Sequence, residues 1–134
     1  MSHFTDNEIA YLNSQRLGRL ATLSAAGEPH VVPVGFRYNP ELDNIDIPGY
    51  GMGKSKKFRD VARDGRVAFV IDDVPQPGQV RGVEVRGRAE ALQTGGNMDV
   101  PNRDPQMIRI RPTRIIGWGI DTDPYHPNSR SVPE

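Results

Sequence analysis

The feature that most limits the possible folds is a strict alternation of side chains along residues 82 to 90. The two alternating sets are Val83, Val85, Gly87 and Ala89, and Glu84, Arg86, Arg88 and Glu90. A period of two places an apolar set and a charged set on opposite faces of a β-strand. Residues Arg66 to Asp72 form a nearly continuous apolar run, which is typical of a strand buried on both sides. The sequence therefore predicts a sheet that covers a core.

Turn residues divide the rest of the chain into short elements. The 134 residues include 14 Gly and 12 Pro, which favours many short strands joined by turns. Six strands are predicted, at Gly18–Ser24, Pro29–Tyr38, Ile45–Gly53, Arg66–Asp72, Val80–Leu92 and Met107–Asp121. Proline cannot donate to a strand ladder, so we expect a bulge or an unpaired N–H at Pro33. We also expect a bend or bulge at Pro112-Thr113.

Two short helices and a tail complete the predicted organisation. Thr5 and Glu8 match a capping box at the start of a helix Asp6–Asn13. Ser55 is well placed as the N-cap of a second helix, Lys56–Arg63. Residues 122–134 have the composition of a flexible tail, so residues 1–121 form the predicted domain. A small closed or split barrel suits these antiparallel hairpins because closure removes exposed sheet edges.

Composition excludes several classes of function. The formal net charge is zero and the pI is about 6.8, which disfavours nucleic-acid binding through a broad basic surface. The absence of cysteine excludes disulfides, a thiolate nucleophile and a zinc–thiolate site. His3 and His126 show no metal-ligand spacing, so no metal site is expected. No signal-peptide core or long apolar run occurs, so we expect a cytoplasmic protein without membrane contact.

All the lysines of the chain lie within four residues. Lys54, Lys56 and Lys57 surround Ser55 at the predicted start of the second helix. Cations at a helix N-terminus oppose the helix dipole and cost about 0.3–1 kcal/mol each. A phosphate bound to the free backbone N–H groups there would neutralise them. The alternative interpretation is a solvated basic turn, and the residues by themselves leave both interpretations open.

Three segments resemble a known family. They are residues 20–34 (Leu-Ala-Thr-Leu-Ser-Ala-Ala-Gly-Glu-Pro-His-Val-Val-Pro-Val), residues 54–66 (Lys-Ser-Lys-Lys-Phe-Arg-Asp-Val-Ala-Arg-Asp-Gly-Arg), and residues 82–90 with 108–112. Their order and spacing resemble the pyridoxamine 5′-phosphate oxidase-like split β-barrel superfamily, above all its deazaflavin (coenzyme F420)-dependent oxidoreductase branch. The resemblance covers about residues 5–121. It implies a mainly β fold, a six-stranded antiparallel Greek-key split barrel with two short helices.

The same resemblance implies a cofactor site. The Ser-x-Lys segment would hold the cofactor phosphate, the second strand would line the tricyclic ring, and the end of the third strand would follow the ribityl chain. The implied residues are Lys54, Ser55, Lys56 and Lys57 for phosphate, Val31, Val32, Pro33 and Val34 for the ring, and Tyr50 and Gly51 for the ribityl chain. Two positions depart from the family pattern. Many relatives carry Thr at position 51 and Asn at position 60, so a cofactor hydrogen bond is lost at Gly51, and Asp60 could pair with a nearby arginine.

The activity implied by the resemblance is hydride transfer between reduced deazaflavin and an unsaturated organic substrate. The alternatives are an FMN-binding pyridoxamine-phosphate-oxidase-like oxidoreductase and a non-catalytic flavin or deazaflavin carrier. The resemblance also implies a homodimer with cofactor sites at the subunit interface, to which Arg86, Arg88 or Trp118 of a partner could contribute. No side chain stands out as an acid or base, and His30 is interpreted as a polar surface residue.

Arginines on the last two strands have a simpler interpretation. We expect Arg86 and Arg88 to form a surface ladder with neighbouring glutamates, and the same holds for Arg109 and Arg111. Binding of an acidic cofactor tail is the secondary interpretation for these residues. Trp118 is expected to anchor the core or the dimer interface.

Overall fold

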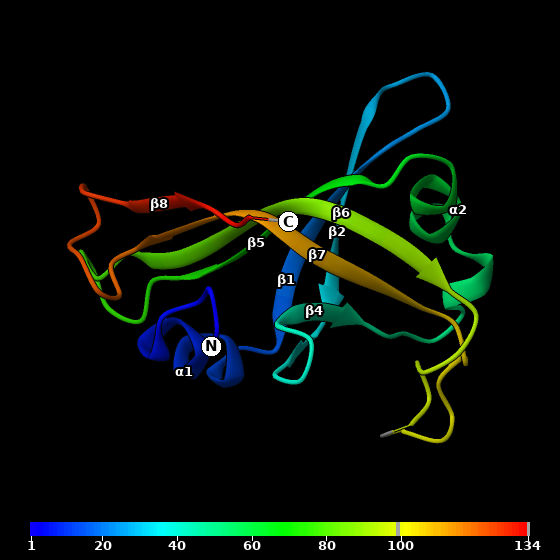
Figure 1. Ribbon diagram of the computed structural model, residues 1–134, viewed down its shortest axis with the longest axis horizontal. Helices are drawn as coiled ribbons and strands as arrows, with labels where there is room; N and C mark the ends of the chain where they lie inside the picture. The colour runs from blue at the N-terminus through cyan, green and yellow to red at the C-terminus, as the bar shows by residue number, and fades with distance from the viewer. Residues whose placement is uncertain (99, 134) are drawn as a thin grey trace.

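Eight antiparallel strands form one curled sheet in the computed structural model, which describes residues 1–98 and 100–133 (Figure 1). The strands are β1 Leu17–Leu23, β2 Pro29–Gly35, β3 Arg37–Asn39, β4 Asn44–Ile47, β5 Arg66–Asp73, β6 Arg81–Leu92, β7 Met107–Trp118 and β8 Asn128–Ser131. Their order across the sheet is β2-β1-β5-β6-β7-β4-β3, and β8 pairs with β7. The predicted mainly β split-barrel class is confirmed, with eight strands in place of the expected six.

The two extra strands are β3, which forms where the chain bends sooner than expected, and β8 in the C-terminal segment. The strand predicted to reach Tyr38 ends at Gly35, and the next residues form β3, which pairs with β4 at the far end of the strand order. The third predicted strand ends at Ile47 because residues 48–51 turn into a 3-10 helix, η1 (Met52–Lys54). The curl of the sheet allows β2 and β3, which follow each other in the chain, to occupy opposite ends of its order.

The prolines behave differently in an edge strand and an inner strand. Pairing of β1 with β2 runs without a register shift past Pro33, so the expected bulge is absent. Because β2 lies at the end of the strand order, it has a neighbouring strand on one side only. The N–H that Pro33 lacks therefore costs no hydrogen bond to a strand on the other side. In β7, the register with β6 shifts between Arg86 and Gly87, opposite Pro112, and this confirms the bulge expected there.

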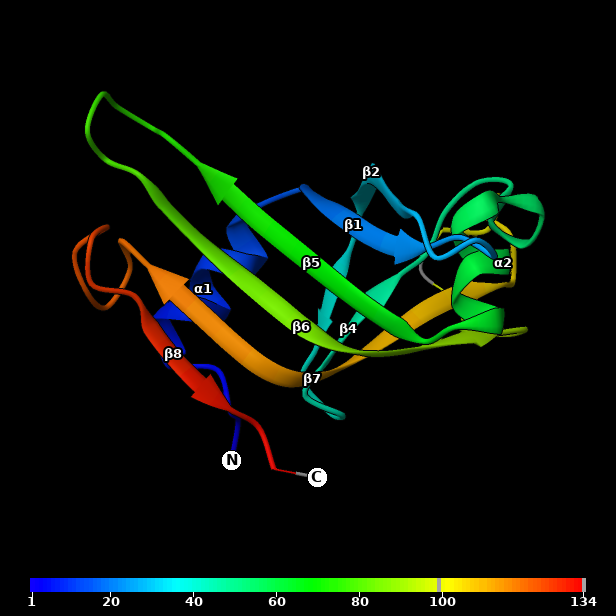
Figure 2. The ribbon, with the colours of Figure 1, turned by 90° about the horizontal axis from the view of Figure 1, so that it is seen from above.

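The long strands β5, β6 and β7 lie side by side and enclose the core with the rest of the sheet (Figure 2). The largest fully buried apolar side chains come from both halves of the barrel; they include Leu20, Ile45, Ile47, Phe69, Ile71, Ile108, Ile110 and Ile115. The helices α1 (Asp6–Ser14) and α2 (Lys56–Arg63) lie at opposite ends of the molecule (Figure 1). Within the described residues, no helix is long and apolar enough to span a membrane.

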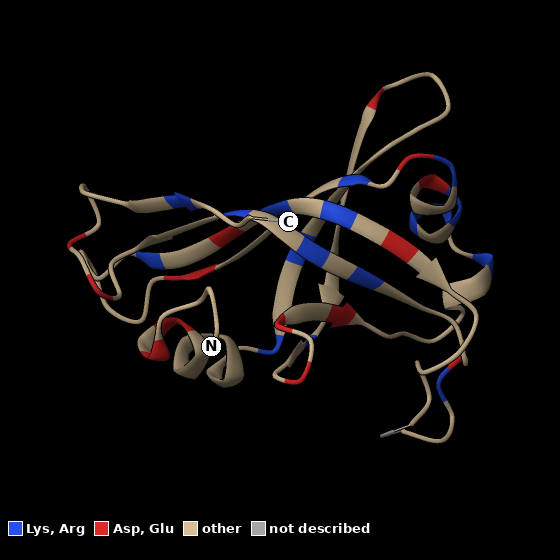
Figure 3. Cartoon of the chain, viewed as in Figure 1, with Lys and Arg blue, Asp and Glu red and all other residues tan. Residues whose placement is uncertain are grey.

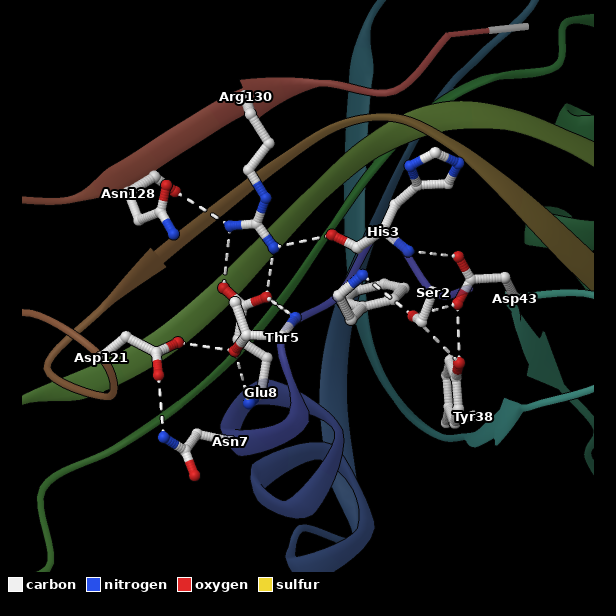
Figure 4. A network of polar contacts seen from close by, with 11 residues as sticks. Ser2, His3, Thr5, Asn7, Glu8, Tyr38, Asp43, Asp121, Asn128 and Arg130 are labelled. Carbon is white, nitrogen blue, oxygen red and sulfur yellow. Dashed lines mark hydrogen bonds and ion pairs between the residues drawn. The ribbon is translucent and has the colours of Figure 1, made fainter.

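The capping box predicted for α1 is present and forms part of a larger network that joins the chain ends (Figure 4). Glu8 is fully buried and accepts the backbone N–H of Thr5 at 2.9 Å. Both of its oxygens also accept hydrogen bonds from the guanidinium of Arg130 in β8. The same guanidinium donates to the carbonyl of His3 at 3.0 Å. The network therefore fastens β8 onto the N-terminal segment.

Strand β8 corrects the expectation of a flexible tail. Residues 128–131 pair with β7 across four registered positions. Arg114 of β7 donates to the hydroxyls of Ser129 at 3.0 Å and Ser131 at 2.8 Å. The polar composition of this segment suggested disorder. The buried partner of Arg130 is Glu8 in α1, and a contact between such distant residues cannot be recognised from the local sequence.

Candidate functional site

The site predicted from the lysines is built on a tight turn that leads into α2. Gly51 adopts a left-handed conformation with a φ of 63°, which glycine accepts without strain, and η1 follows it. Ser55 ends η1 and caps α2. Its hydroxyl donates to the Met52 carbonyl at 2.7 Å and accepts the backbone N–H of Phe58 at 3.3 Å. The predicted N-cap is confirmed, and the hydroxyl of Ser55 is already engaged in shaping the turn.

The three lysines have three different environments. Lys56 reaches back along the helix to Asp60, with 3.3 Å between Nζ and either carboxylate oxygen. Lys54 is exposed to solvent. Lys57 is half-buried, and partial burial lowers the pKa of its ammonium below the usual value. Neither Lys54 nor Lys57 has an ion pair with any residue that the structure describes. Two cations at this helix start are therefore available to an anion.

Asp60 is the polar centre of the helix face that meets the sheet. Its side chain is only 2% exposed and accepts hydrogen bonds from Thr22 at 3.0 Å and Arg63 at 2.9 Å. Burial by itself would raise the pKa of this carboxyl, but the hydrogen bonds from Arg63, Thr22 and Lys56 hold it below its usual value. The predicted pairing of Asp60 with an arginine is confirmed.

An acidic residue that the sequence did not single out completes the turn before α2. The carboxylate of Asp104 accepts the backbone N–H of Gly51 at 3.1 Å and of Gly53 at 3.2 Å. Its own N–H donates to the Gly49 carbonyl at 3.3 Å. About fifty residues separate the two segments, so no local pattern could indicate this contact. Asp104 and the glycine turn thus join the loop between β6 and β7 to the site.

The residues predicted beside the ribityl chain form an open edge. Tyr50 is 69% exposed. At Gly51, no heavy atom lies within 4 Å of the position that a Cβ would take, so the surface is free there. These two residues lie directly before the lysine segment in space as well as in sequence, since η1 joins them to Ser55.

The four residues predicted to line the ring do not share one face. Val31 and Pro33 point outward, and Val31 is 65% exposed. Val34 is buried and Val32 packs against the core. Side chains alternate between the two faces of a strand, so Val31 and Pro33 share one face of β2, and Val32 and Val34 share the other. A ligand on one side of the strand could contact only one of these two pairs. The strand β2 thus presents two opposite surfaces, and the lining of the ring by Val31–Val34 stays a prediction.

The outward surface of β2 continues across β1 and β5 as an apolar face. Val31 is paired with Ala21, and Ala21 with Ala68, so three small apolar side chains form a row. An open groove of about 310 Å³ lies on this face, bordered by these residues together with Val70 and Glu84. This apolar groove adjoins the predicted ring strand at Val31.

The arginines of the last strands divide into surface and structural groups. Arg86 pairs with Glu84 at 2.9 Å, as expected for a surface ladder. Arg109 behaves differently, because it donates at 2.8 Å to Asp46, whose side chain is 2% exposed. Trp118 is partly buried and lies over Gly82 of the paired strand, where a Cβ would collide with the indole ring. Figure 3 shows the basic bands on β6 and β7 in addition to those at α2.

His30 departs from the surface interpretation. It is half-buried in β2, directly opposite Thr22, and its Nδ1 atom is buried without a hydrogen-bond partner among the described residues. Its ring lies on the same face of β2 as Val32 and Val34, which explains its partial burial.

Comparison with known proteins gives a consistent result. Residues 4–119 match the family model described as pyridoxamine 5′-phosphate oxidase. A Streptomyces rimosus protein named 5a,11a-dehydrotetracycline/5a,11a-dehydrooxytetracycline reductase is 53% identical over 122 residues, which covers 90% of this chain and 86% of that protein.

Solved structures share the fold at lower sequence identity. The conserved hypothetical protein Rv2991 from Mycobacterium tuberculosis superposes with a TM-score of 0.69 at 22% identity, covering 85% of this chain and 84% of that one. An FAD binding protein from Mycobacterium smegmatis gives a TM-score of 0.65 at 21% identity, covering 87% and 96% of the two chains. These likenesses support the fold.

Proposed function

Since this chain belongs to the pyridoxamine 5′-phosphate oxidase family, we propose that it is an oxidoreductase that uses coenzyme F420 to reduce an unsaturated organic substrate. The 53% identical relative is named as a reductase of dehydro compounds, which supports the direction of the reaction and the substrate class. The alternative cofactor is FMN, because the fold is shared with a flavin-binding protein and the lysine site suits any phosphorylated cofactor.

The observation that carries this proposal is the half-buried Lys57 at a Ser55-capped helix start. Lys57 loses part of its hydration and has no acidic partner among the described residues. This raises the free energy of its charged form, and a bound anion would compensate for that cost. The backbone N–H groups of Lys56 and Lys57 precede the first bonded turn of α2 and have no acceptor within the helix, whereas that of Phe58 is bonded to Ser55. A phosphate bound there would satisfy both.

The residues would divide the work of holding the cofactor. Lys57 and Lys54 would neutralise the phosphate, while Lys56 stays paired with Asp60 and supports the helix. Ser55 would act by shaping the turn, because its hydroxyl is already bonded. Tyr50 and Gly51 would follow the chain between phosphate and ring, and β2 would support the ring on one of its faces.

When bound, the cofactor supplies the hydride. The protein's part is to orient the ring and the substrate and to exclude water from them. No described side chain is placed by this structure as an obligatory proton donor, so solvent is a sufficient proton source. A non-catalytic carrier would bind the cofactor equally well, and turnover with the reduced cofactor distinguishes the two.

We also propose that the chain forms a homodimer across the outward face of β2, β1 and β5. The row Val31, Ala21 and Ala68 is apolar, and Leu17 on the same strand face is 54% exposed. Burial of such a face between two copies would remove apolar surface from water and close the groove against the ring strand. Sedimentation equilibrium that finds only monomers at tens of micromolar protein would contradict this assembly.

Equilibrium binding of F420 and FMN to the wild type and to Lys57→Ala tests the cofactor proposal. We expect the wild type to prefer F420, and the variant to bind roughly tenfold or more weakly, since it loses a charged contact with phosphate. Arg16→Ala is a matched control, because Arg16 is an exposed cation between α1 and β1. Its affinity should equal that of the wild type.

The other outcomes are equally informative. Preference for FMN would assign the protein to the flavin-dependent alternative. Absence of micromolar binding to either cofactor would contradict the phosphate site and leave the lysines as a surface turn. Tight F420 binding without turnover on any unsaturated acceptor would favour the carrier.

A further inference from the structure

The side chain of Asp104 bonds to the turn before α2 at more than one point. Its two carboxylate oxygens accept hydrogen bonds from two different backbone N–H groups, those of Gly51 at 3.1 Å and Gly53 at 3.2 Å. The backbone N–H of Asp104 also donates to the carbonyl of Gly49 at 3.3 Å. One residue of the β6–β7 loop is therefore bonded to three positions of the turn.

The composition of this turn makes such bonds important. Glycine occupies positions 49, 51 and 53, and glycine loses more conformational freedom on ordering than any other residue. Gly51 has a φ of 63°, and no heavy atom lies within 4 Å of the position that a Cβ would take there. Met52 is fully buried and anchors the turn to the core. The carboxylate of Asp104 holds the glycines on either side of this anchor.

The shape of the turn determines where α2 begins. The backbone N–H of Lys54 donates to the carbonyl of Gly51 at 3.2 Å. The N–H of Ser55 donates to the carbonyl of Met52 at 3.0 Å, and Ser55 then caps α2. A continuous series of backbone bonds thus leads from the glycine turn to the helix start that carries Lys57.

The β6–β7 loop that carries Asp104 is braced by contacts of its own. The N–H of Gly96 donates to the carbonyl of Pro105 at 2.8 Å, which closes the loop on itself. The loop also packs closely on the turn, since a Cβ built at Gly53 would lie 2.8 Å from the side chain of Gln106. The loop can therefore support the turn from outside.

We propose that Asp104 is a positioning residue that fixes the glycine turn, and through it the start of α2, in the form that binds the cofactor phosphate. The inference rests on the proposed function and adds to that site a support from the β6–β7 loop. A site that is ordered in advance loses less conformational entropy on binding than one that its ligand must order. Asp104 is itself an anion, so Coulomb interaction alone would make its removal favour an anionic cofactor. The positioning role predicts the opposite sign.

The test compares Asp104→Ala and Asp104→Asn with the wild type. Alanine removes both acceptors, whereas asparagine removes the charge and keeps one carbonyl oxygen. Asp123→Ala is a matched control, because Asp123 accepts the backbone N–H of Tyr125 at 2.8 Å in the β7–β8 loop, at the end of the molecule away from α2 (Figure 1). The probes are F420 and FMN, each paired with its phosphate-free counterpart, the deazaflavin chromophore fragment and riboflavin. Amide hydrogen exchange at Gly51 and Gly53 and thermal unfolding are measured without ligand.

We expect Asp104→Ala to bind the phosphorylated probe roughly tenfold more weakly and Asp104→Asn to lose less. Affinity for the phosphate-free probe should be unchanged. The KM for the cofactor should rise by a similar factor, while kcat at saturating cofactor stays within about twofold of the wild type. Without ligand, the amides of Gly51 and Gly53 should exchange faster in Asp104→Ala, and its Tm should stay within a few degrees of the wild type. Asp123→Ala should match the wild type in affinity, in KM and in exchange at the two glycines.

Four results would overturn the inference. One is an unchanged or increased affinity of Asp104→Ala for the phosphorylated probe. Another is an equal loss for probes with and without phosphate. The third is unchanged exchange at Gly51 and Gly53. The fourth is a large fall in ligand-free Tm in both variants, which would make Asp104 a residue of the general fold.

Failure of the proposed function gives a different result. In that case the wild type itself binds neither phosphorylated probe, and the inference fails with the function. If only the inference fails, the wild type binds its cofactor and Asp104→Ala binds it as well.

Discussion

Two polar regions of this protein differ in how completely their buried groups are paired. At the chain ends, Glu8 is bonded to Arg130, Thr5 and, through them, to the N-terminal backbone (Figure 4). Among the residues that the structure describes, Lys57 at the start of α2 has no acidic partner, and His30 in β2 has an unpaired nitrogen. A fully paired network stabilises the fold, whereas unpaired groups destabilise the free protein and become favourable only with a ligand.

The comparison also explains why the two regions tolerate change differently. Removal of one member of the paired network leaves its partner buried without compensation. Removal of an unpaired group leaves nothing behind. Substitutions at the chain ends should therefore lower stability, and substitution of Lys57 should lower ligand affinity.

Arg130→Ala is expected to have the largest effect on stability. It leaves the carboxylate of Glu8 buried without its guanidinium, and loss of one partner from a buried pair costs about 3 kcal/mol or more. Urea unfolding at neutral pH measures the loss. Arg114→Ala is the matched control, since its bonds to the exposed serines of β8 should contribute about 1 kcal/mol or less. Equal losses in the two variants would break the comparison.

Asp60→Asn should have an intermediate effect that depends on pH. The variant loses the ion pairs with the half-exposed Lys56 and Arg63, at a cost of about 2 kcal/mol. The folded-state pKa of Asp60 lies below the ordinary 3.8, so its contribution is present above that pH and is lost as pH falls through the folded value.

The measurement is the difference in unfolding free energy between wild type and Asp60→Asn as a function of pH. The difference should be constant at roughly pH 5 to 7 and should shrink below pH 3.8. Other carboxyl groups whose pKa is lowered, such as those of Asp43 and Asp121, are present in both proteins. Their contributions to the unfolding free energy therefore cancel in the difference. A difference that does not change with pH would show that the charge of Asp60 is unimportant.

The smallest effects are expected at two adjacent lysines and have opposite signs. Lys56→Ala loses the pair with Asp60 and should destabilise the free protein by about 0.3–1 kcal/mol. Lys57→Ala removes an unpaired cation from a helix N-terminus and should be neutral or stabilising by a few tenths of a kcal/mol. Chemical unfolding of both variants without cofactor resolves the order. Equal destabilisation by the two would show that Lys57 has a structural role.

Local patterns were sufficient for much of the fold. The alternation around Val85, the capping box of Thr5 and Glu8, the Ser55 cap and the bulge at Pro112 each depend on neighbours in the chain, and each is present. The lysine cluster was visible for the same reason, because the dipole of a helix acts within its first turn. Asp60 was recognised as a pairing partner, although not as a buried one.

The errors came from contacts between distant segments. Residues 128–131 resembled a flexible tail because the residue that buries Arg130 lies 122 positions away in α1. His30 resembled a surface residue because its partial burial depends on the strand pairing that sets it opposite the buried Thr22. No local sequence pattern singled out Asp104, because its carboxylate bonds to the backbone of Gly51 and Gly53, which are distant in the chain.

The sequence by itself determined a mainly β domain, the family and the position of a basic helix start, because periodicity, capping and charge act over a few residues. The tertiary structure alone decided which of those charges are paired. Pairing depends on how the sheet curls and which segments meet, and the entropy of closing long loops is offset only by the assembled core. That difference separates the structural Glu8–Arg130 pair from the unpaired Lys57 and His30.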